Sequence, residues 1–350
     1  MTEFDFIRRI RSATPPHPRV LVGPGDDCAV LALNTKRLLV TTDLLTEGVD
    51  FVLSECGPRA VGRKAMAVNL SDIAAMGGRP TAAVVGVVVG RDLTPRPPLR
   101  TGEGVFKAQT QSVSQPTQSQ AQAAPGESSR VEHPLSGSER GTGGEVLEDL
   151  HLGLRDVADR FGVPLVGGDT NSWAGGLVVS VTVLGEPIRE PVLRGGAKVG
   201  DWVFVTGPCG GSILGRHLDP TPRLAEAEAL VTSFPPHAMI DVSDGLAADL
   251  HHLLEESGCG AVLDADAVPV HPDAVELAKR TGKSPLEHAL GDGEDFELVF
   301  TVSPVAGERL LANPPVPVWK IGECVVEPGL WITEGGVRRP LAVTGWQHQL

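Results

Sequence analysis

The sequence predicts an α/β protein of two domains. Short apolar runs rich in β-branched residues, typical of buried strands, alternate along the chain with longer segments whose apolar residues recur at helical spacing. The length of 350 residues fits two domains, and a hydrophobic content of 41% is enough for a core in each. The polar, glycine-rich segment 187–200 is the best boundary, so the predicted domains are residues 1–186 and 197–350.

The first predicted domain carries carboxylates at the ends of its strands. An apolar strand at 38–42 ends on Asp43, and a second strand ends in a glycine turn with Asp169. Ligands often gather at such strand ends. The helix predicted at 59–76 contains Asp72 late in its length, where a carboxylate opposes the helix dipole and needs a cation nearby, unless it is simply solvated. The other elements predicted here are strands at 81–89 and 177–184 and a helix at 145–161.

Residues 93–144 interrupt this pattern. They repeat Pro, Gln, Ser and Gly and have almost no periodic apolar residues. Such a composition cannot bury enough apolar surface to offset the entropy lost on ordering. The sequence therefore predicts a disordered insertion in a loop of the N-terminal domain, without a chemical role.

The second predicted domain is organised around residues 240–250. They read as the end of a strand, a sharp turn at Gly245 and the start of a helix, and they contain Asp241, Ser243 and Asp244. Two close carboxylates repel unless a cation lies between them, and carboxylate oxygens suit Mg²⁺. An Asp that caps an ordinary helix is the alternative. Other elements predicted here are helices at 224–231 and 271–281, strands at 201–206, 261–265, 316–321 and 329–333, and a glycine loop at 207–212 that opens a helix.

Composition narrows the possible partners. Lys and Arg number 30 against 44 Asp and Glu, a net charge of −14, which argues against nucleic acid. No apolar run reaches membrane-spanning length, and the N-terminus lacks a signal-peptide core. The five scattered cysteines form no CxxC pair and read as reduced thiols, so a cytoplasmic location is expected.

Acidic turns recur through both domains. Residues 23–30 form a further glycine turn with Asp26 and Asp27 at its tip. Walker, GxGxxG, HExxH and GxSxG motifs are absent from the positions where they would act. Clusters of carboxylates at strand ends and helix starts can hold several Mg²⁺ ions, which would neutralise a polyphosphate in place of Lys and Arg.

Several of these motifs together resemble those of the thiamine-monophosphate kinase family. They run in the family's order over nearly the whole chain outside 93–144, and the motifs that begin at Asn69 and Gly293 are the most specific. The motifs are Gly-Asp-Asp-Cys-Ala-Val at 25–30, Thr-Thr-Asp-Leu-Leu-Thr-Glu-Gly-Val-Asp-Phe at 41–51, Lys-Ala-Met-Ala-Val-Asn-Leu-Ser-Asp-Ile-Ala-Ala-Met-Gly at 64–77, Gly-Gly-Asp-Thr at 167–170, Asp-Val-Ser-Asp-Gly-Leu at 241–246 and Gly-Glu-Asp-Phe-Glu-Leu at 293–298.

The resemblance implies a fold and a reaction. The fold is that of aminoimidazole ribonucleotide synthetase, with α+β sandwich-like layers: an N-terminal domain whose mixed sheet and helices form a homodimer, and a C-terminal α/β domain. The implied reaction is phosphorylation of thiamine monophosphate to thiamine diphosphate, with ATP as co-substrate and several Mg²⁺ ions. Transfer would be direct and in line, without a catalytic acid or base, because the acceptor phosphate is already ionised at neutral pH.

The resemblance also assigns site residues by position. The implied magnesium ligands are Asp27, Thr42, Asp43, Asp72, Asp169, Asp241 and Asp244. The implied contacts to ATP or its metals are Thr41, Gly168, Arg194 and Ser243. The implied contacts to the thiamine phosphate are Asp50, Glu294 and Trp346, the last by stacking on a cationic ring. The family usually has His where this chain has Asp50, and a carboxylate there would repel the acceptor phosphate.

Two other readings remain open at this point. The first is a related enzyme of the same fold, similar to aminoimidazole ribonucleotide synthetase or selenophosphate synthetase. The latter calls for a reactive Cys near the N-terminus, and Cys28 has no glycine-rich nucleophile setting. The second is a non-catalytic factor that binds magnesium and nucleotide in a maturation complex. Loss of the metal-site acids would favour that function, and none of them is missing.

Overall fold

The computed structural model describes residues 15–22, 30–34, 36–90 and 143–346. The acidic turn with Asp26 and Asp27 lies outside the described residues, as does Cys28. The predicted insertion also lies outside them, except for residues 143 and 144, which begin a helix.

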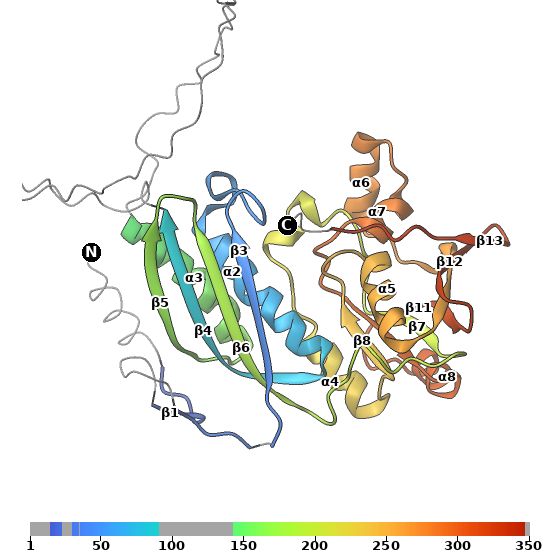
Figure 1. Cartoon of the computed structure of the whole chain (residues 1–350), viewed down its shortest axis with the longest axis horizontal. Helices are drawn as coiled ribbons and strands as arrows, with labels where there is room; N and C mark the ends of the chain where they lie inside the picture. The colour runs from blue at the N-terminus through green and yellow to red at the C-terminus, as the bar shows by residue number, and fades with distance from the viewer. Residues whose placement is uncertain (1–14, 23–29, 35, 91–142, 347–350) are drawn as a thin grey trace, which may run out of the picture.

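The N-terminal part of the chain forms a mixed four-stranded sheet. Its strand order is β3-β6-β4-β5, with β4 and β5 parallel and the other neighbours antiparallel. The mixed sheet predicted for this part is therefore present (Figure 1). The strands are β3 Leu39–Thr46, β4 Gly78–Gly90, β5 Leu165–Trp173 and β6 Val178–Pro187, and a separate hairpin is formed by β1 Val20–Val22 and β2 Val30–Leu31.

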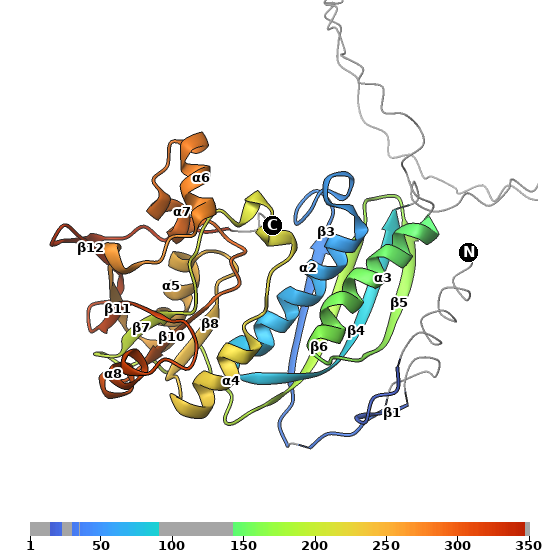
Figure 2. The ribbon, with the colours of Figure 1, turned by 180° about the vertical axis from the view of Figure 1, so that it is seen from behind.

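Two helices, α2 Leu53–Ala75 and α3 Gly143–Arg160, cover one face of this sheet (Figure 2). The helix predicted at 59–76 begins earlier in the structure, but the chain kinks at Gly57, whose φ of 74° is not helical. The two helices pack closely because glycines lie at their crossing. A Cβ on Gly62 would come within 2.2 Å of a carbonyl oxygen of α3, and one on Gly153 within 2.0 Å of a carbonyl oxygen of α2.

The opposite face of the sheet has no helix over it among the residues that the structure describes (Figure 1). Alternation along β3 buries Leu39 and Leu45 against the helices and turns Val40 and Leu44 outward. These two outward side chains are 61% and 62% exposed. This helix-free face therefore presents apolar side chains to its surroundings.

The C-terminal part forms a seven-stranded sheet in the order β13-β12-β9-β11-β7-β10-β8, antiparallel except for β9 and β12. Its strands are β7 Trp202–Val205, β8 Ala238–Asp241, β9 Gly260–Asp264, β10 Leu298–Val302, β11 Trp319–Val325, β12 Gly329–Glu334 and β13 Val337–Pro340. Its helices are α4 Leu224–Ser233, α5 Leu246–Ser257, α6 Pro272–Thr281, α7 Pro285–Gly291 and α8 Pro304–Ala312. A 3₁₀ turn, η4 Ala265–Ala267, follows β9.

One prediction for this part was wrong. The glycine loop at 207–212 does not open an α-helix, because the chain continues into two 3₁₀ turns, η2 Ser212–Leu214 and η3 Arg216–Leu218. Positive φ angles at Gly210, Gly211 and Gly215 break any regular helix here.

The two sheets are joined through α2. One buried cluster contains Phe204 and Phe300 of the second sheet, whose rings stack at 5.6 Å, together with Leu230 of α4. Ala74 and Ala75, at the end of α2, belong to the same cluster. The C-terminal end of α2 thus packs in the core of the second part, which fixes the carboxylates of both parts relative to one another.

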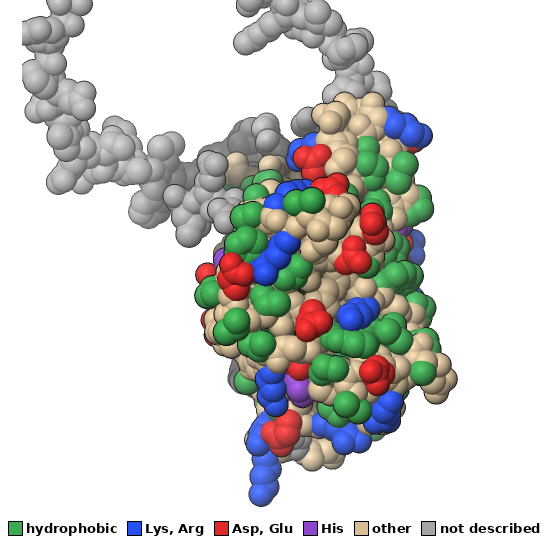
Figure 3. All heavy atoms as spheres, turned by 90° about the vertical axis from the view of Figure 1, so that its right-hand side faces the viewer, with side chains coloured by type: hydrophobic (Ala, Val, Ile, Leu, Met, Phe, Trp, Pro, Cys, Tyr) green, Lys and Arg blue, Asp and Glu red, His purple; other side chains and the backbone are tan. Residues whose placement is uncertain are grey.

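The surface of the second part carries mixed charge. On the face shown in Figure 3, acidic and basic side chains are interspersed among apolar ones. Across the described part of the chain, no helix has the length and apolar character that crossing a bilayer requires.

Candidate functional site

A cavity of about 940 Å³ lies between the two parts of the chain. The N-terminal part contributes the end of β3, the turn that follows it and one side of α2, and the C-terminal part contributes η2, η3 and the turns after β8 and α7. Four predicted metal ligands line it, namely Asp43, Asp72, Asp241 and Asp244.

Two hydroxyl groups of the N-terminal part hold two of these carboxylates. The Thr41 hydroxyl donates to Asp72 Oδ2 within the N-terminal part. Ser71 lies next to Asp72 on α2, and its hydroxyl donates across the junction to Asp241 Oδ2 at 2.6 Å. The carboxylates of α2 and β8 are therefore brought together by direct contact between the two parts of the chain.

Burial, together with neighbouring charges, shifts the pKa values of these acids. Burial, followed by the charges of Asp72 and Asp50, raises the pKa of Asp43 to about 7. Burial, followed by the charge of Asp72, raises the pKa of Asp241 to about 7 as well. Burial also raises the pKa of Asp72, against the opposing effects of the Thr41 hydroxyl and the Arg194 charge. A cation between these carboxylates would relieve the same repulsion.

The third carboxylate of the 240–250 segment has a different place. Asp249 is 2% exposed and accepts hydrogen bonds from the N–H groups of Asp244 and Gly245, both at 3.0 Å. Burial, with the charges of Asp241 and Asp244, raises its pKa to about 8. Asp249 therefore shapes the turn at Gly245, where φ is 131°, and leaves Asp244 to face the cavity.

Two other predicted magnesium ligands lie elsewhere. Thr42 is next to Asp43 on β3 and so faces the opposite side of the sheet, where its hydroxyl donates to Val181 O and accepts from Thr182. Asp169 lies on β5, at the edge of the sheet opposite β3. Its register with Gly86, Ser180 and Leu44 places its side chain on the same helix-free face. Within one chain, neither side chain joins the cluster at Asp43. Asp27 lies outside the described residues.

Of the four predicted contacts to ATP, some lie beside the acidic cluster and others lie elsewhere on the structure. Thr41 and Ser243 adjoin the acidic cluster, the first through Asp72 and the second as part of the cavity wall. Arg194 is exposed, and its charge acts on Asp72. Gly168 is on β5, where a Cβ would come within 2.0 Å of the carbonyl oxygen of Val85. Its lack of a side chain thus allows β4 and β5 to approach.

The three predicted acceptor contacts also line the cavity. Asp50 lies in the turn after β3 and Glu294 in the loop before β10. Trp346 lies near the C-terminus, and its main-chain N–H donates to Asp244 O at 2.9 Å. The Asp50 carboxylate accepts from Thr46 N–H at 2.7 Å, so it also stabilises its own turn.

The hydrogen bond between the Thr46 N–H and the Asp50 carboxylate decides which substitution at Asp50 removes only its charge. Asp50→Asn keeps an oxygen for the Thr46 N–H and removes a negative charge from the acceptor side of the cavity. We expect a lower KM for a phosphate-bearing acceptor and a smaller change in the KM for ATP, because the Asp50 charge acts on Asp43 and is not among the causes that shift the pKa of Asp72 or Asp241. Steady-state kinetics with both substrates varied would measure this, and Asp50→Ala, which also loses the turn contact, is the matched control. A raised acceptor KM in Asp50→Asn would show that the Asp50 charge binds the acceptor productively.

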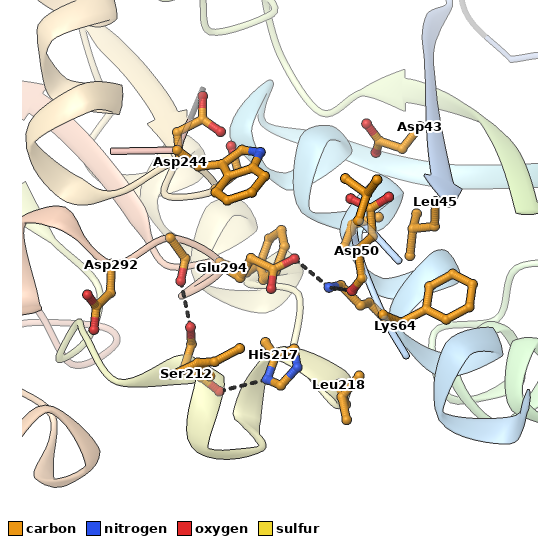
Figure 4. A pocket seen from close by; sticks show the side chains of 18 of the residues that line it. Asp43, Leu45, Asp50, Lys64, Ser212, His217, Leu218, Asp244, Asp292 and Glu294 are labelled. Atoms are coloured by element: carbon orange, nitrogen blue, oxygen red, sulfur yellow. Dashed lines mark hydrogen bonds and ion pairs between the residues drawn. The ribbon is translucent and has the colours of Figure 1, made fainter. Parts of the chain in front are cut away.

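Two polar residues of the cavity lining, Lys64 and His217, were not predicted from the sequence. Lys64 of α2 lines the cavity with its ammonium group paired to Glu294, as Figure 4 shows. His217 of η3 also lines it and bonds through Nδ1 to Ser212 O at 2.9 Å. Lys64 is the first residue of the motif at 64–77, and this position in a family motif could have indicated a role in the site. Nothing in the sequence around His217 distinguishes it from a surface His.

The side chains of the described residues can be compared with the ligands that Mg²⁺ prefers. No three Asp, Glu, His or Cys side chains of the described part lie close enough to enclose one ion. Mg²⁺ rarely needs such a cage, because one or two carboxylates with waters and substrate phosphates usually complete its shell. The paired carboxylates and their raised pKa values therefore fit Mg²⁺ carried with a nucleotide.

Comparison with known proteins gives the same family for the whole chain. The family of AIR synthase related proteins matches through its N-terminal domain at residues 25–117 and 133–186 and through its C-terminal domain at 198–333. The thiamine-monophosphate kinase of Rhodopirellula baltica is 36% identical over 338 residues, which cover 94% of this chain and 91% of that protein.

Solved structures agree with this result. The thiamine-monophosphate kinase of Stenotrophomonas maltophilia K279a is 28% identical with a TM-score of 0.69, covering 95% of this chain and 96% of that one. AaThiL in complex with AMPPCP and TMP is 27% identical with a TM-score of 0.68, covering 99% and 96%. The hydrogenase maturation protein HypE of E. coli, at 19% identity and a TM-score of 0.67 over 97% of this chain and 96% of that one, shares the fold alone. This chain belongs to the AIR synthase related proteins and, among them, to the thiamine-monophosphate kinase family.

Proposed function

We propose that this protein transfers the terminal phosphoryl group of ATP to thiamine monophosphate in the cavity between its two parts, with Mg²⁺ held by the acidic cluster. The observation that carries the proposal is that the carboxylates of Asp43, Asp72 and Asp241 line the same cavity as Glu294 and Trp346. The relatives reported above support the choice of substrates.

The chain's own residues have distinct tasks in this reaction. Asp43, Asp72, Asp241 and Asp244 would hold the metal ions, which when bound would neutralise the phosphate charge of ATP. Thr41 and Ser71 fix the carboxylates that they contact. Positioning and charge would supply the rate, as in other phosphoryl transfers.

The acceptor needs little activation. Its phosphate monoester is largely ionised at neutral pH, since the second pKa of such groups is about 6. An acceptor oxygen forms a bond to the γ-phosphorus while the bond from that phosphorus to the bridging oxygen breaks, and ADP leaves with the electron pair. No side chain has to remove a proton, so no catalytic acid or base is assigned.

A direct assay separates this function from the alternatives. The protein, ATP and Mg²⁺ are incubated with thiamine monophosphate, and in parallel with thiamine, whose acceptor is a neutral alcohol. We expect equal amounts of thiamine diphosphate and ADP with the first and no product with the second. ADP formed without thiamine diphosphate would favour a related enzyme of the same fold, and the absence of both products would favour a non-catalytic nucleotide-binding factor.

We also propose that the chain, divided into domains at 1–186 and 197–350, forms a homodimer in the cytoplasm through the helix-free face of its N-terminal sheet. The exposed apolar side chains of Val40, Leu44 and Val84 on this face support the proposal. A dimer of this kind would bring Asp169 of each subunit to the interface. Nucleic acid is not an expected partner, given the net charge of −14 and the mixed charge visible in Figure 3.

Charge on this face should separate the subunits. We expect the double variant Val40→Lys with Leu44→Lys to be monomeric, because like charges would be buried against each other in the dimer. Light scattering coupled to size-exclusion chromatography would measure the mass. Val326→Lys, at a residue that is 79% exposed after β11, is the matched control and should remain dimeric. A dimer that survives the double substitution would place the interface elsewhere.

A further inference from the structure

Lys64 is a buried cation in a cavity otherwise rich in carboxylates. Its residue is 1% exposed, and its side chain is among the largest that are fully buried. Of the described residues that line the cavity, it is the sole Lys or Arg. Burying an ammonium group is costly unless hydrogen bonds and an opposite charge compensate it, so its contacts indicate why it is there.

Lys64 makes two polar contacts with other residues of the cavity lining. Its Nζ donates to the main-chain oxygen of Asp50 at 2.7 Å and lies 2.5 Å from Glu294 Oε1 (Figure 4). Asp50 belongs to the turn that follows β3, and Glu294 to the loop that precedes β10. One ammonium group therefore links segments from both parts of the chain.

The backbone at Glu294 shows that its side chain is held in a specific direction. Glu294 has a φ of 62°, and a positive φ is uncommon in residues other than glycine. Its N–H donates to Ser243 O at 2.7 Å, which ties the loop to the turn beside the acidic cluster. This backbone conformation and the ion pair with Lys64 together direct the Glu294 carboxylate toward the cavity.

We propose that Lys64 is a positioning residue for the acceptor, an inference that rests on the proposed function. It sets the distance between the Asp50 turn and the Glu294 loop and holds the Glu294 carboxylate where an acceptor with a cationic ring and a phosphate can meet it. Its removal would also leave the described residues of the cavity lining without a Lys or Arg, so no fixed cation among them would offset the negative charge of the acceptor phosphate. Both effects act through Asp50 and Glu294, whereas the carboxylates of Asp72 and Asp241 are held by Thr41 and Ser71.

The test is the kinetic effect of Lys64→Met. We expect the KM for thiamine monophosphate to rise by about tenfold or more, the effect of losing a hydrogen bond to a charged group. The KM for ATP and the kcat at saturating acceptor should hold. The matched control is Arg223→Met, which breaks the buried pair between Arg223 and Glu297 outside the cavity lining. It should lower Tm without changing the acceptor KM.

A second variant keeps the proposal testable if the single one is unstable. Lys64→Met with Glu294→Gln removes both charges, so no unpaired carboxylate stays in the cavity wall and Tm should recover toward that of the wild type. The acceptor KM should stay raised. A wild-type acceptor KM in either variant would overturn the role of Lys64 while the proposed function stands. A wild-type protein that makes no thiamine diphosphate would overturn both.

Discussion

Asp241→Asn is expected to lower kcat by about a thousandfold while the free protein becomes no less stable. Loss of several kcal/mol of charge stabilisation in the transition state gives an effect of this order, since about 1.4 kcal/mol corresponds to tenfold in rate. The substituted amide keeps an oxygen for the Ser71 hydroxyl, which now donates to Oδ2 at 2.6 Å. It also removes one of the negative charges that oppose each other around Asp72.

Steady-state rates at saturating ATP, thiamine monophosphate and Mg²⁺, together with thermal melts in a chelator, would measure both effects. Asp266→Asn is the matched control, because Asp266 is exposed on η4 and lies outside the cavity lining. Its rate and Tm should equal those of the wild type. An Asp241→Asn enzyme with full activity at limiting Mg²⁺ would remove Asp241 from the metal site.

The stability of the metal-free protein is expected to fall as pH rises from about 4 to about 7. Unfolded carboxyl groups lose their protons near pH 4. Asp43 and Asp241 in the folded protein have pKa values of about 7, so between these values the folded state binds more protons than the unfolded one. The free energy of unfolding therefore decreases over this window, and it decreases further toward pH 8 because the pKa of Asp249 is raised to about 8.

Adding Mg²⁺ should restore the stability that the metal-free protein loses as pH rises, and this stabilisation should be larger at high pH. Protons compete with the metal for the same carboxylates, so the rise in Tm on adding Mg²⁺ should be larger at pH 8 than at pH 5.5. Calorimetry over a pH series, with chelator or with Mg²⁺, would measure it. In the double variant Asp43→Asn with Asp241→Asn the slope should flatten. An equal slope in that variant would assign the pH dependence to other groups.

Much of the fold followed from periodicity and turn residues. The valines of β6 alternate as a half-buried strand should, and α2 ends before Gly77, whose φ is 64°. The sequence also carried unused signals. Ser284 and Glu287 form a capping box, and Pro285 is the first residue of α7, a helix that was not predicted.

The candidate site was harder to predict because its parts converge only in three dimensions. Ser71 and Asp241 are 170 residues apart, and no local pattern predicts their hydrogen bond. Thr42 and Asp43 are neighbours in a motif, yet the strand turns them to opposite faces. Lys64 occupies a helical position that spacing alone assigns to the core. Residue type identified the acids, but the structure decides which of them share a cavity.

The dependence of thiamine diphosphate formation on free Mg²⁺ tests most directly whether the acidic cluster holds metal ions during the reaction. With MgATP saturating and constant, we expect the rate to keep rising as free Mg²⁺ exceeds the ATP concentration, because the carboxylates of the cavity hold ions besides the one that accompanies ATP. Asp241→Asn should shift this dependence to higher Mg²⁺. A rate that follows MgATP alone, with the same dependence in Asp241→Asn, would contradict a reaction organised by metal ions on this acidic cluster.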